Sequence, residues 1–205
     1  TTGTLITTAC GPKTVETLRV GDAIVTADHG LQSIRWIGRS ELSGSQLNAN
    51  PTQRPVRIAK ETLGSGYPSQ DLTVSRQHRI LIRSSIAEKM FGHSEVLIAA
   101  CKLISIEGIE ELECPDGVTY FHIMFDQHEI IFANGTPTES LYTGAEALKS
   151  VPYESMVELL SLFPELANQA THTRMARYCP EKGHRARRLA TRHAQSQQPL
   201  LQACR

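Results

Sequence analysis

The sequence contains no apolar run long enough to cross a bilayer, and it does not start with the charged and then apolar order of a signal peptide. Its formal net charge is zero, so no overall field draws the chain to nucleic acid or to an anionic membrane. Five cysteines occur, an odd number, and no two have CxxC spacing. These absences argue against a membrane span, a zinc ribbon and a disulfide framework. They leave the cellular location of the chain open.

The balance of charge hides an asymmetry between the body of the chain and its C-terminal end. From Thr171 onward, eight lysines and arginines face one acidic residue, Glu181. Such a tail is either solvated or packed on an acidic body, or it contacts an acidic partner such as a phosphate backbone or an anionic lipid surface. Tyr178 is the one aromatic residue among these arginines, which weakens the case for nucleic acid, because single strands stack on aromatic side chains.

Short apolar and β-branched runs separated by turn residues dominate residues 1 to about 140. The runs that we expect to form strands are Thr4–Thr7, Ala23–Thr26, Leu31–Ile37, Val56–Ile58, Leu72–Val74, Ile80–Ile82, Glu95–Ala99, Tyr120–Phe125 and Glu129–Ala133. Turns are expected at Cys10–Lys13, Val20–Asp22, Asp28–Gly30 and Asn134–Gly135, and the last two are typical of hairpins. The Ser- and Asn-rich segment 41–53 is expected to be a loop. This pattern predicts a mainly β fold of barrel-like or sandwich type.

The composition changes after residue 141. Residues 144–149 and 153–163 are expected to form helices. Four apolar residues repeat there at helical spacing, which predicts a face packed on the β body: Met156, Leu159, Leu160 and Phe163. We therefore expect a β domain at 1–142 and a helical, Arg-rich C-terminal extension at 143–205.

Ser75-Arg76-Gln77-His78 follows an apolar run and supplies the first candidate chemistry. A hydroxyl three residues before a histidine at a strand end can place both side chains at one site. Imidazole is the side chain that exchanges protons near neutral pH without perturbation, and a hydroxyl can orient it or polarise a carbonyl. Taken alone the pattern is weak, because a histidine at a strand end is more often structural.

Other segments give this pattern a context through their order along the chain. Gly3-Thr4-Leu5 opens the sequence, and Leu18–Asp22 follows about fifteen residues later. Leu31–Gly38 comes next, and Ile131–Gly135 lies near the end of the β part. With Ser75–His78 in place of a TxxH motif, this order resembles Hint (Hedgehog/intein-type) autoprocessing domains.

The likeness is to the bacterial Hint group attached to large secreted-type proteins, which also carries segments similar to Asp126–Glu129 and Pro137–Ser140. It implies a mainly β, horseshoe-like Hint fold of short strands with a helical C-terminal extension. It is compatible with a place in a secreted or cell-surface bacterial protein.

The resemblance also implies an N-to-S acyl shift, in which a cysteine thiol attacks the preceding peptide carbonyl and turns an amide into a thioester. His78 would protonate the scissile nitrogen as it leaves, and Ser75 would support the tetrahedral intermediate or orient the imidazole. The substrate would be the chain's own upstream polypeptide, and the acceptor would be water or an external nucleophile. We expect a monomer that needs no cofactor and no metal.

Three positions depart from the family pattern. By register with Gly3-Thr4-Leu5, the nucleophilic cysteine belongs two residues before Thr1; Cys10 lies in a predicted turn, where a small structural residue is the simpler interpretation. Gly38 stands where Hedgehog-type domains carry a catalytic aspartate, which disfavours sterol transfer. Glu139-Ser140 stands where inteins end in His-Asn, which disfavours complete splicing because serine cannot cyclise as asparagine does.

His122, Asp126 and His128 are further candidates for the second half-reaction. They are separated by even numbers of residues, so they would share one face if a single strand ran through them. The alternative is a polar strand end that turns at Asp126-Gln127. A metal site made by these histidines with Cys101 or Cys114 is not favoured, since no pair has a recognised ligand spacing.

Two other classes of function remain open from the sequence. The chain could be a Hint scaffold that has lost activity and serves as a rigid binding or spacer module. It could also be a β-barrel that binds nucleic acid through its basic tail.

Overall fold

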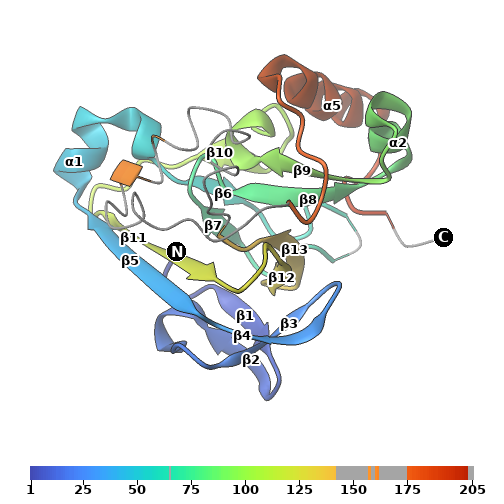
Figure 1. The fold of residues 1–205 in the computed structure, drawn as a ribbon. Coiled ribbons are helices and arrows are strands. Elements are labelled where there is room, and N and C mark those ends of the chain that lie inside the picture. The colour runs from blue at the N-terminus through green and yellow to red at the C-terminus, as the bar shows by residue number, and fades with distance from the viewer. Residues whose placement is uncertain (65, 142–156, 158–159, 162–174, 203–205) are drawn as a thin grey trace.

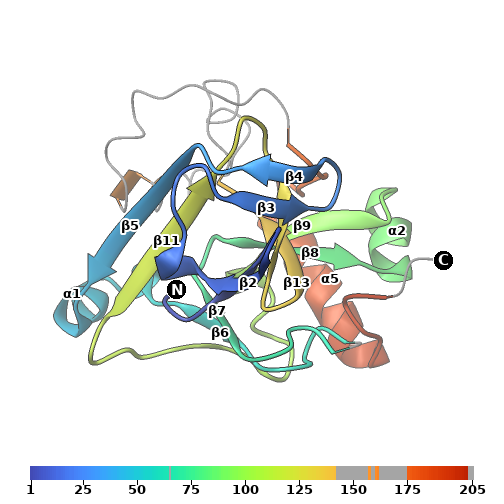
Figure 2. The same ribbon diagram turned by 90° about the horizontal axis from the view of Figure 1, so that it is seen from below.

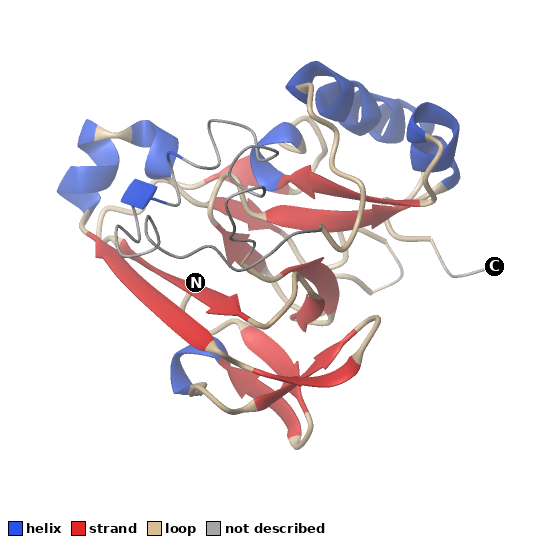
Figure 3. Ribbon diagram, in the orientation of Figure 1, coloured by secondary structure: helices blue, strands red, loops and turns tan. Residues whose placement is uncertain are grey.

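The computed structural model describes residues 1–64, 66–141, 157, 160–161 and 175–202. Strands dominate the described residues, and the helices lie at the periphery (Figure 3). The strands are β1 (Leu5–Thr8), β2 (Gly11–Thr14), β3 (Ala23–Thr26), β4 (Gly30–Ser33), β5 (Trp36–Leu42), β6 (Val56–Ile58), β7 (Leu72–Val74), β8 (Arg79–Arg83), β9 (Glu95–Ala99), β10 (Ile109–Glu111), β11 (Val118–Met124), β12 (Ile130–Ala133) and β13 (Thr136–Glu139). The helices are α1 (Gly44–Ala49), α2 (Ser85–Phe91) and α5 (Gly183–Ser196), with short 3-10 turns at Val15–Thr17, Pro51–Gln53 and Ala100–Lys102. The predicted mainly β class is confirmed.

The strands form three sheets. The largest has the order β2-β1-β3-β12-β13-β8-β9, with β4 paired to β3. A second sheet has the order β10-β6-β7, and β5 pairs with β11 as a long two-stranded ribbon. The ribbon runs along one side of the molecule, as both views show (Figures 1 and 2). Because β12 pairs with β1 as well as with β3 and β13, the last strands of the β part sit beside the first one.

One hydrophobic core joins these sheets. Strand β8 is buried at four consecutive positions, Arg79–Ile82, because it lies inside the large sheet with β13 on one side and β9 on the other. Helices α2 and α5 lie against each other beside β8 and β9 (Figure 1). The core therefore includes residues of the C-terminal extension: Ala186, Leu189, Ala190, Leu200 and Leu201.

The runs expected to form strands all contain strands, but two predicted connections are wrong. The expected loop at 41–53 contains the end of β5, helix α1 and a 3-10 turn. Ser43 begins α1 with a capping box, in which its side chain accepts from the backbone N–H of Gln46 and the Gln46 side chain accepts from Ser43. The loop was predicted from the many Ser and Asn residues in this segment. The Ser-x-x-Gln spacing of Ser43 and Gln46 is, however, a signal for the start of a helix.

The turn expected at Cys10–Lys13 is also wrong in extent. Only Ala9 and Cys10 turn, and Gly11–Thr14 forms β2 against β1. The hairpin at Asn134–Gly135 is confirmed, with positive φ at both residues. Its second strand, β13, has the sequence Thr-Pro-Thr-Glu, which lacks the apolar alternation that would have revealed it.

Parts of the predicted helices lie outside the described residues. This holds for all of 144–149 and most of 153–163; Val157, Leu160 and Ser161 are described and are helical. Leu160 packs against the cluster of Tyr120, Met124 and Leu141, as expected for its place on the apolar face. None of the described helices combines the length and the apolar character that a membrane crossing requires.

The shared core predicts that the C-terminal extension and the β body unfold together. Leu189 in α5 has 0% exposure. Leu189→Ala should therefore lower the free energy of unfolding by about 2–5 kcal/mol in urea titrations followed by circular dichroism. The exposed neighbour Arg188 is the matched control, and Arg188→Ala should change it by less than about 0.5 kcal/mol. A second, separate unfolding transition would contradict the shared core.

Candidate active site

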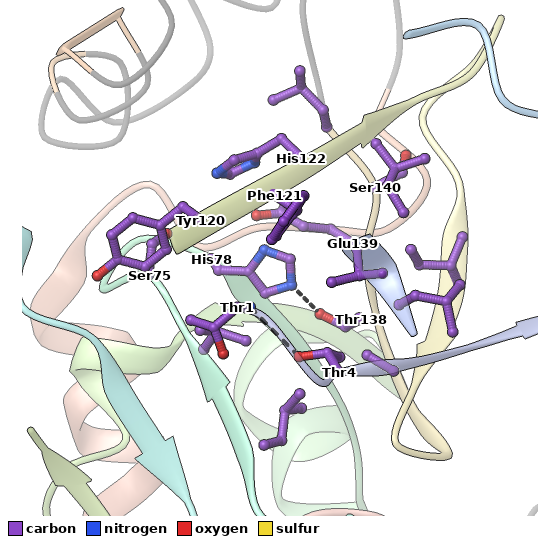
Figure 4. Close-up of a pocket in the computed structure, with 18 residues that line it drawn as sticks. Thr1, Thr4, Ser75, His78, Tyr120, Phe121, His122, Thr138, Glu139 and Ser140 are labelled. Atoms are coloured by element: carbon purple, nitrogen blue, oxygen red, sulfur yellow. Dashed lines mark hydrogen bonds between the residues drawn. The ribbon is translucent and has the colours of Figure 1, made fainter. Parts of the chain in front are cut away.

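A small cavity of about 50 Å³ lies where the N-terminus meets β11 and β13. Thr1, His78, His122 and Thr138 project into it from four separate parts of the chain (Figure 4). Its volume suits a water molecule or a small side chain. Apolar residues complete the wall: Ile6, Val15, Leu72, Val74, Ile123, Ile131 and Leu141.

The Ser75–His78 segment forms the turn between β7 and β8. The backbone N–H of His78 donates to the carbonyl of Ser75 (3.2 Å), and the carbonyl of His78 accepts from Ala100 N–H (2.9 Å). These bonds fix the backbone on both sides of the imidazole. Ser75 is 5% exposed and lines the same cavity as His78, so the fold brings these two residues to one place.

Thr138 fixes the proton on the His78 ring. The Thr138 hydroxyl donates its single proton to the carbonyl of Arg79 (2.8 Å). It must therefore accept from Nε2 of His78, 2.5 Å away. The neutral imidazole consequently carries its proton on Nε2 and leaves Nδ1 free of a proton.

His122 is the second imidazole of the cavity. Its ring centre lies 6.4 Å from that of His78, at an interplanar angle of 64°. Burial lowers the pKa of His78 to about 4 and that of His122 to about 3. At neutral pH both rings are therefore uncharged, which is the state that can accept a proton.

Glu139 forms a buried ion pair behind the cavity. Its carboxylate accepts from Nη1 of Arg79 (2.9 Å) and from the backbone N–H of the same residue (2.8 Å). Burial acts to raise the pKa of Glu139, but Arg79 and then His128 outweigh it and hold that pKa at about 2. The anion lines the cavity and acts to raise the pKa of His78 against the effect of burial.

The other two predicted residues lie outside the cavity lining. Strand β11 ends at Met124, so the even spacing of His122, Asp126 and His128 does not place them on one face. Asp126 is exposed and pairs with Arg35 (2.6 Å). His128 is 3% exposed and lies behind the cavity, with Nε2 3.6 Å from Glu139 Oε2.

The amino group of Thr1 is buried beside these residues. It donates to the carbonyl of Thr73 (3.2 Å), which also accepts from the Thr1 hydroxyl (3.0 Å). Burial lowers the pKa of this amino group to about 6. Thr1 also borders an open polar groove of about 630 Å³, which runs past Ser43 and Thr119. Thr1 therefore borders both the cavity and the groove.

The sequence did not point to Thr138, Arg79 or Tyr120 as members of the site. Thr138 contacts His78 across 60 residues of chain, and Arg79 binds Glu139 across a similar separation. The signal in the sequence was only indirect. Thr138 and Glu139 belong to the Pro137–Ser140 segment, which is part of the resemblance to Hint sequences. Tyr120 lines the cavity with its ring and donates its hydroxyl to the carbonyl of Gln53 (2.6 Å).

The cysteines within the described residues lie away from the cavity lining. Cys10 is exposed at the β1–β2 turn. Across the described part of the chain, no group of three His, Cys, Asp or Glu residues is arranged to hold a metal ion. Gly38 faces His122 across the β5–β11 ribbon, so a side chain at position 38 would be a cross-strand neighbour of that imidazole.

Comparison with known proteins agrees with this architecture. The family model described as "Hint domain" matches residues 1–145. The chain therefore belongs to the Hint-domain family, a class of intein-like self-processing domains. No curated protein matches the sequence.

Several solved structures are similar in outline. A bacterial intein-like domain from Clostridium thermocellum has 11% identity and a TM-score of 0.47, covering 68% of this chain and 96% of its own. The MchDnaB-1 intein (N145AA) has 14% identity and a TM-score of 0.43, with coverage of 67% and 96%. The gp41-1 intein has 16% identity and a TM-score of 0.40, with coverage of 66% and 92%.

The uncharged histidines predict that stability falls as the pH is lowered. An unfolded histidine takes up its proton near 6.5, whereas His78 and His122 do so near 4 and 3. The unfolded state therefore binds more protons between these values, and each histidine should remove about 1–2 kcal/mol of unfolding free energy between pH 7 and pH 5. The charged or titratable groups facing them are Glu139, Arg79, His128 and the Thr1 amino group.

His122→Phe is the variant that isolates this effect. It should lose less stability than the wild type between pH 7 and pH 5, measured by urea unfolding at each pH. Parallel pH dependence in the two proteins would show that His122 is not held uncharged by the fold.

Proposed function

We propose that this Hint domain performs an N-to-S acyl shift at the junction just upstream of Thr1. The single observation that carries the proposal is the position of the buried Thr1 nitrogen, which is at the wall of a cavity holding His78, Ser75 and His122. A cysteine two residues before Thr1 would have its Cα within about 8 Å of the Cα of Thr1. Its thiol and the peptide bond that precedes it would then reach the cavity.

The protonation of His78 supports a route for the proton. Because Thr138 holds the Nε2 proton, Nδ1 is available to take the proton of the thiol. The thiolate then attacks the preceding carbonyl carbon, and the C–N bond breaks as His78 returns that proton to the leaving nitrogen. The result is a thioester and a free amine, with no net gain or loss of protons.

Ser75 and His122 are suited to support roles in this step. The Ser75 hydroxyl lines the cavity and can donate to the oxygen that becomes negative in the tetrahedral intermediate. The neutral His122 ring lies beside His78 and can also accept and return the thiol proton. The low pKa values of both imidazoles mean that both rings are uncharged at neutral pH and would hold the proton only transiently during the step.

The end of the β part favours cleavage or transfer over splicing. Ser140 is buried at the position where an intein would carry its terminal asparagine, and its hydroxyl accepts from the backbone N–H of Glu129 (2.9 Å). A serine has no side-chain amide nitrogen with which to form a succinimide. Gly38 likewise offers no carboxylate beside His122, which argues against activation of a sterol. Water or an external nucleophile entering by the groove is the acceptor that remains.

A fusion tests the proposal directly. A reporter followed by a cysteine two positions before Thr1 should be released by dithiothreitol or hydroxylamine, as followed by gel electrophoresis and mass spectrometry. His78→Ala should slow release by about 10²–10⁴-fold, because it removes the residue that carries the proton. Ser75→Ala should slow it by about 10²-fold at most if the hydroxyl supports the oxyanion.

Two further variants sharpen this experiment. Replacing the upstream cysteine by alanine should abolish release. Asp126→Ala should leave release unchanged, since Asp126 is exposed and bound to Arg35. A folded fusion that stays intact with thiols, or one that His78→Ala does not slow, would instead favour a Hint scaffold without activity.

A further inference from the structure

The C-terminal extension reaches the back of the candidate site through residues Met175–Cys179, here termed the strap. The strap runs beside β9, which is an edge strand of the large sheet, and Tyr178 forms a parallel bridge with Val96. The carbonyl of Tyr178 accepts from Leu97 N–H (2.9 Å). The strap therefore continues the sheet in the direction of His128.

Arg177 anchors the strap to the β body. Its guanidinium binds Asp28 (2.7 Å) and Glu95 (2.5 Å), and it also donates to the carbonyl of Ala176 (2.8 Å). The Tyr178 ring stacks on His93 with centres 4.7 Å apart. These contacts tie the strap to the β3–β4 turn and to β9, so the position of Ala176 is well fixed.

The backbone of the strap sets the protonation of His128. The N–H of Ala176 points at Nδ1 of His128 (3.1 Å). A backbone N–H can only donate, so Nδ1 must accept and the ring proton must lie on Nε2. That N–H faces Glu139, with Nε2 3.6 Å from Oε2. At this separation the ring N–H interacts directly with the buried carboxylate.

Glu139 connects His128 to the cavity. Its carboxylate lines the cavity, and Thr138, the preceding residue on β13, holds the His78 proton. The partner of Glu139, Arg79, also interacts with Cys179 at the end of the strap. The strap thus contacts both groups that hold the Glu139 carboxylate, His128 and Arg79.

We infer that the strap is a positioning element for the self-processing reaction: Ala176 fixes the His128 tautomer, and His128 orients Glu139 beside His78. His128 is then a positioning residue and not one that touches the reacting atoms. The inference rests on the proposed acyl shift for its kinetic consequence, but the tautomer itself is independent of any activity.

Two substitutions at His128 separate positioning from direct catalysis. The amide nitrogen of glutamine can take the place of imidazole Nε2 and donate to Glu139, whereas the shorter asparagine can only take the place of Nδ1 and accept from Ala176. In the cysteine-restored reporter fusion, His128→Gln should retain a rate within about threefold of the wild type, because an amide presents its N–H to Glu139 without a tautomer for Ala176 to fix. His128→Asn should lose about 10–100-fold, as is usual for a lost supporting hydrogen-bond partner.

The strap itself is tested by removing one donor. Ala176→Pro deletes the N–H that binds His128 and should slow release by about tenfold or more. Arg185→Ala is the matched control. Arg185 also lies in the extension but binds α2, through the carbonyl of Met90 and the ring of Phe91, so its loss should leave the rate unchanged. Thermal melts of every variant separate slow reaction from failure to fold.

Nitrogen-15 NMR of the histidine rings gives a readout that does not depend on activity. His128 should show a protonated Nε2 and an unprotonated Nδ1 at neutral pH, and Ala176→Pro should mix the two tautomers. A wild-type ring protonated on Nδ1 would overturn the inference, and so would equal rates in folded His128→Gln and His128→Asn. If the wild-type fusion does not cleave while the tautomer is as expected, the proposed function fails and the positioning by the strap stands.

Discussion

The buried pair of Arg79 and Glu139 is the interaction on which the rest of the site depends. A carboxylate with less than a tenth of its side chain exposed is costly unless it is paired and fully hydrogen-bonded. Here Arg79 supplies both its guanidinium and its backbone N–H, and His128 adds a third contact. Because the pair joins β8 to β13, it fixes the register that brings Thr138 to His78. Removal of either partner would leave a charge buried in the core.

The same pair connects the chemistry of the cavity with the C-terminal extension. On one side, Glu139 lies beside two histidines that burial holds uncharged at neutral pH. On the other side, Arg79 and His128 contact the strap. The extension is therefore built into the core that supports the site, through Leu189, Leu201 and the strap, although it lies beyond the family match at residues 1–145.

The sequence predicted the strands well because alternation and turn residues are local signals. It missed β13, because the Thr-Pro-Thr-Glu sequence is polar and does not show that neighbouring elements bury it. It missed α1 because a polar composition outweighed the Ser43–Gln46 capping box. At the site, Ser75, His78 and His122 were identified and do line one cavity. Asp126 and His128 were grouped with His122 because they are an even number of residues apart. Even spacing places residues on one face only within a continuous strand, and β11 ends at Met124.

By itself, the sequence determined the family and singled out the Ser75–His78 segment, since both depend on the order of motifs along the chain. The mainly β class followed from the same local patterns. Only the tertiary structure decided which groups surround His78. Thr138 and Glu139 are about 60 residues away and reach it because β13 pairs with β8, with Thr138 opposite Ile80. The tautomer of His128 was decided in the same way by Ala176, 48 residues further on. Such cross-strand neighbours are set by register and burial, for which no local pattern codes.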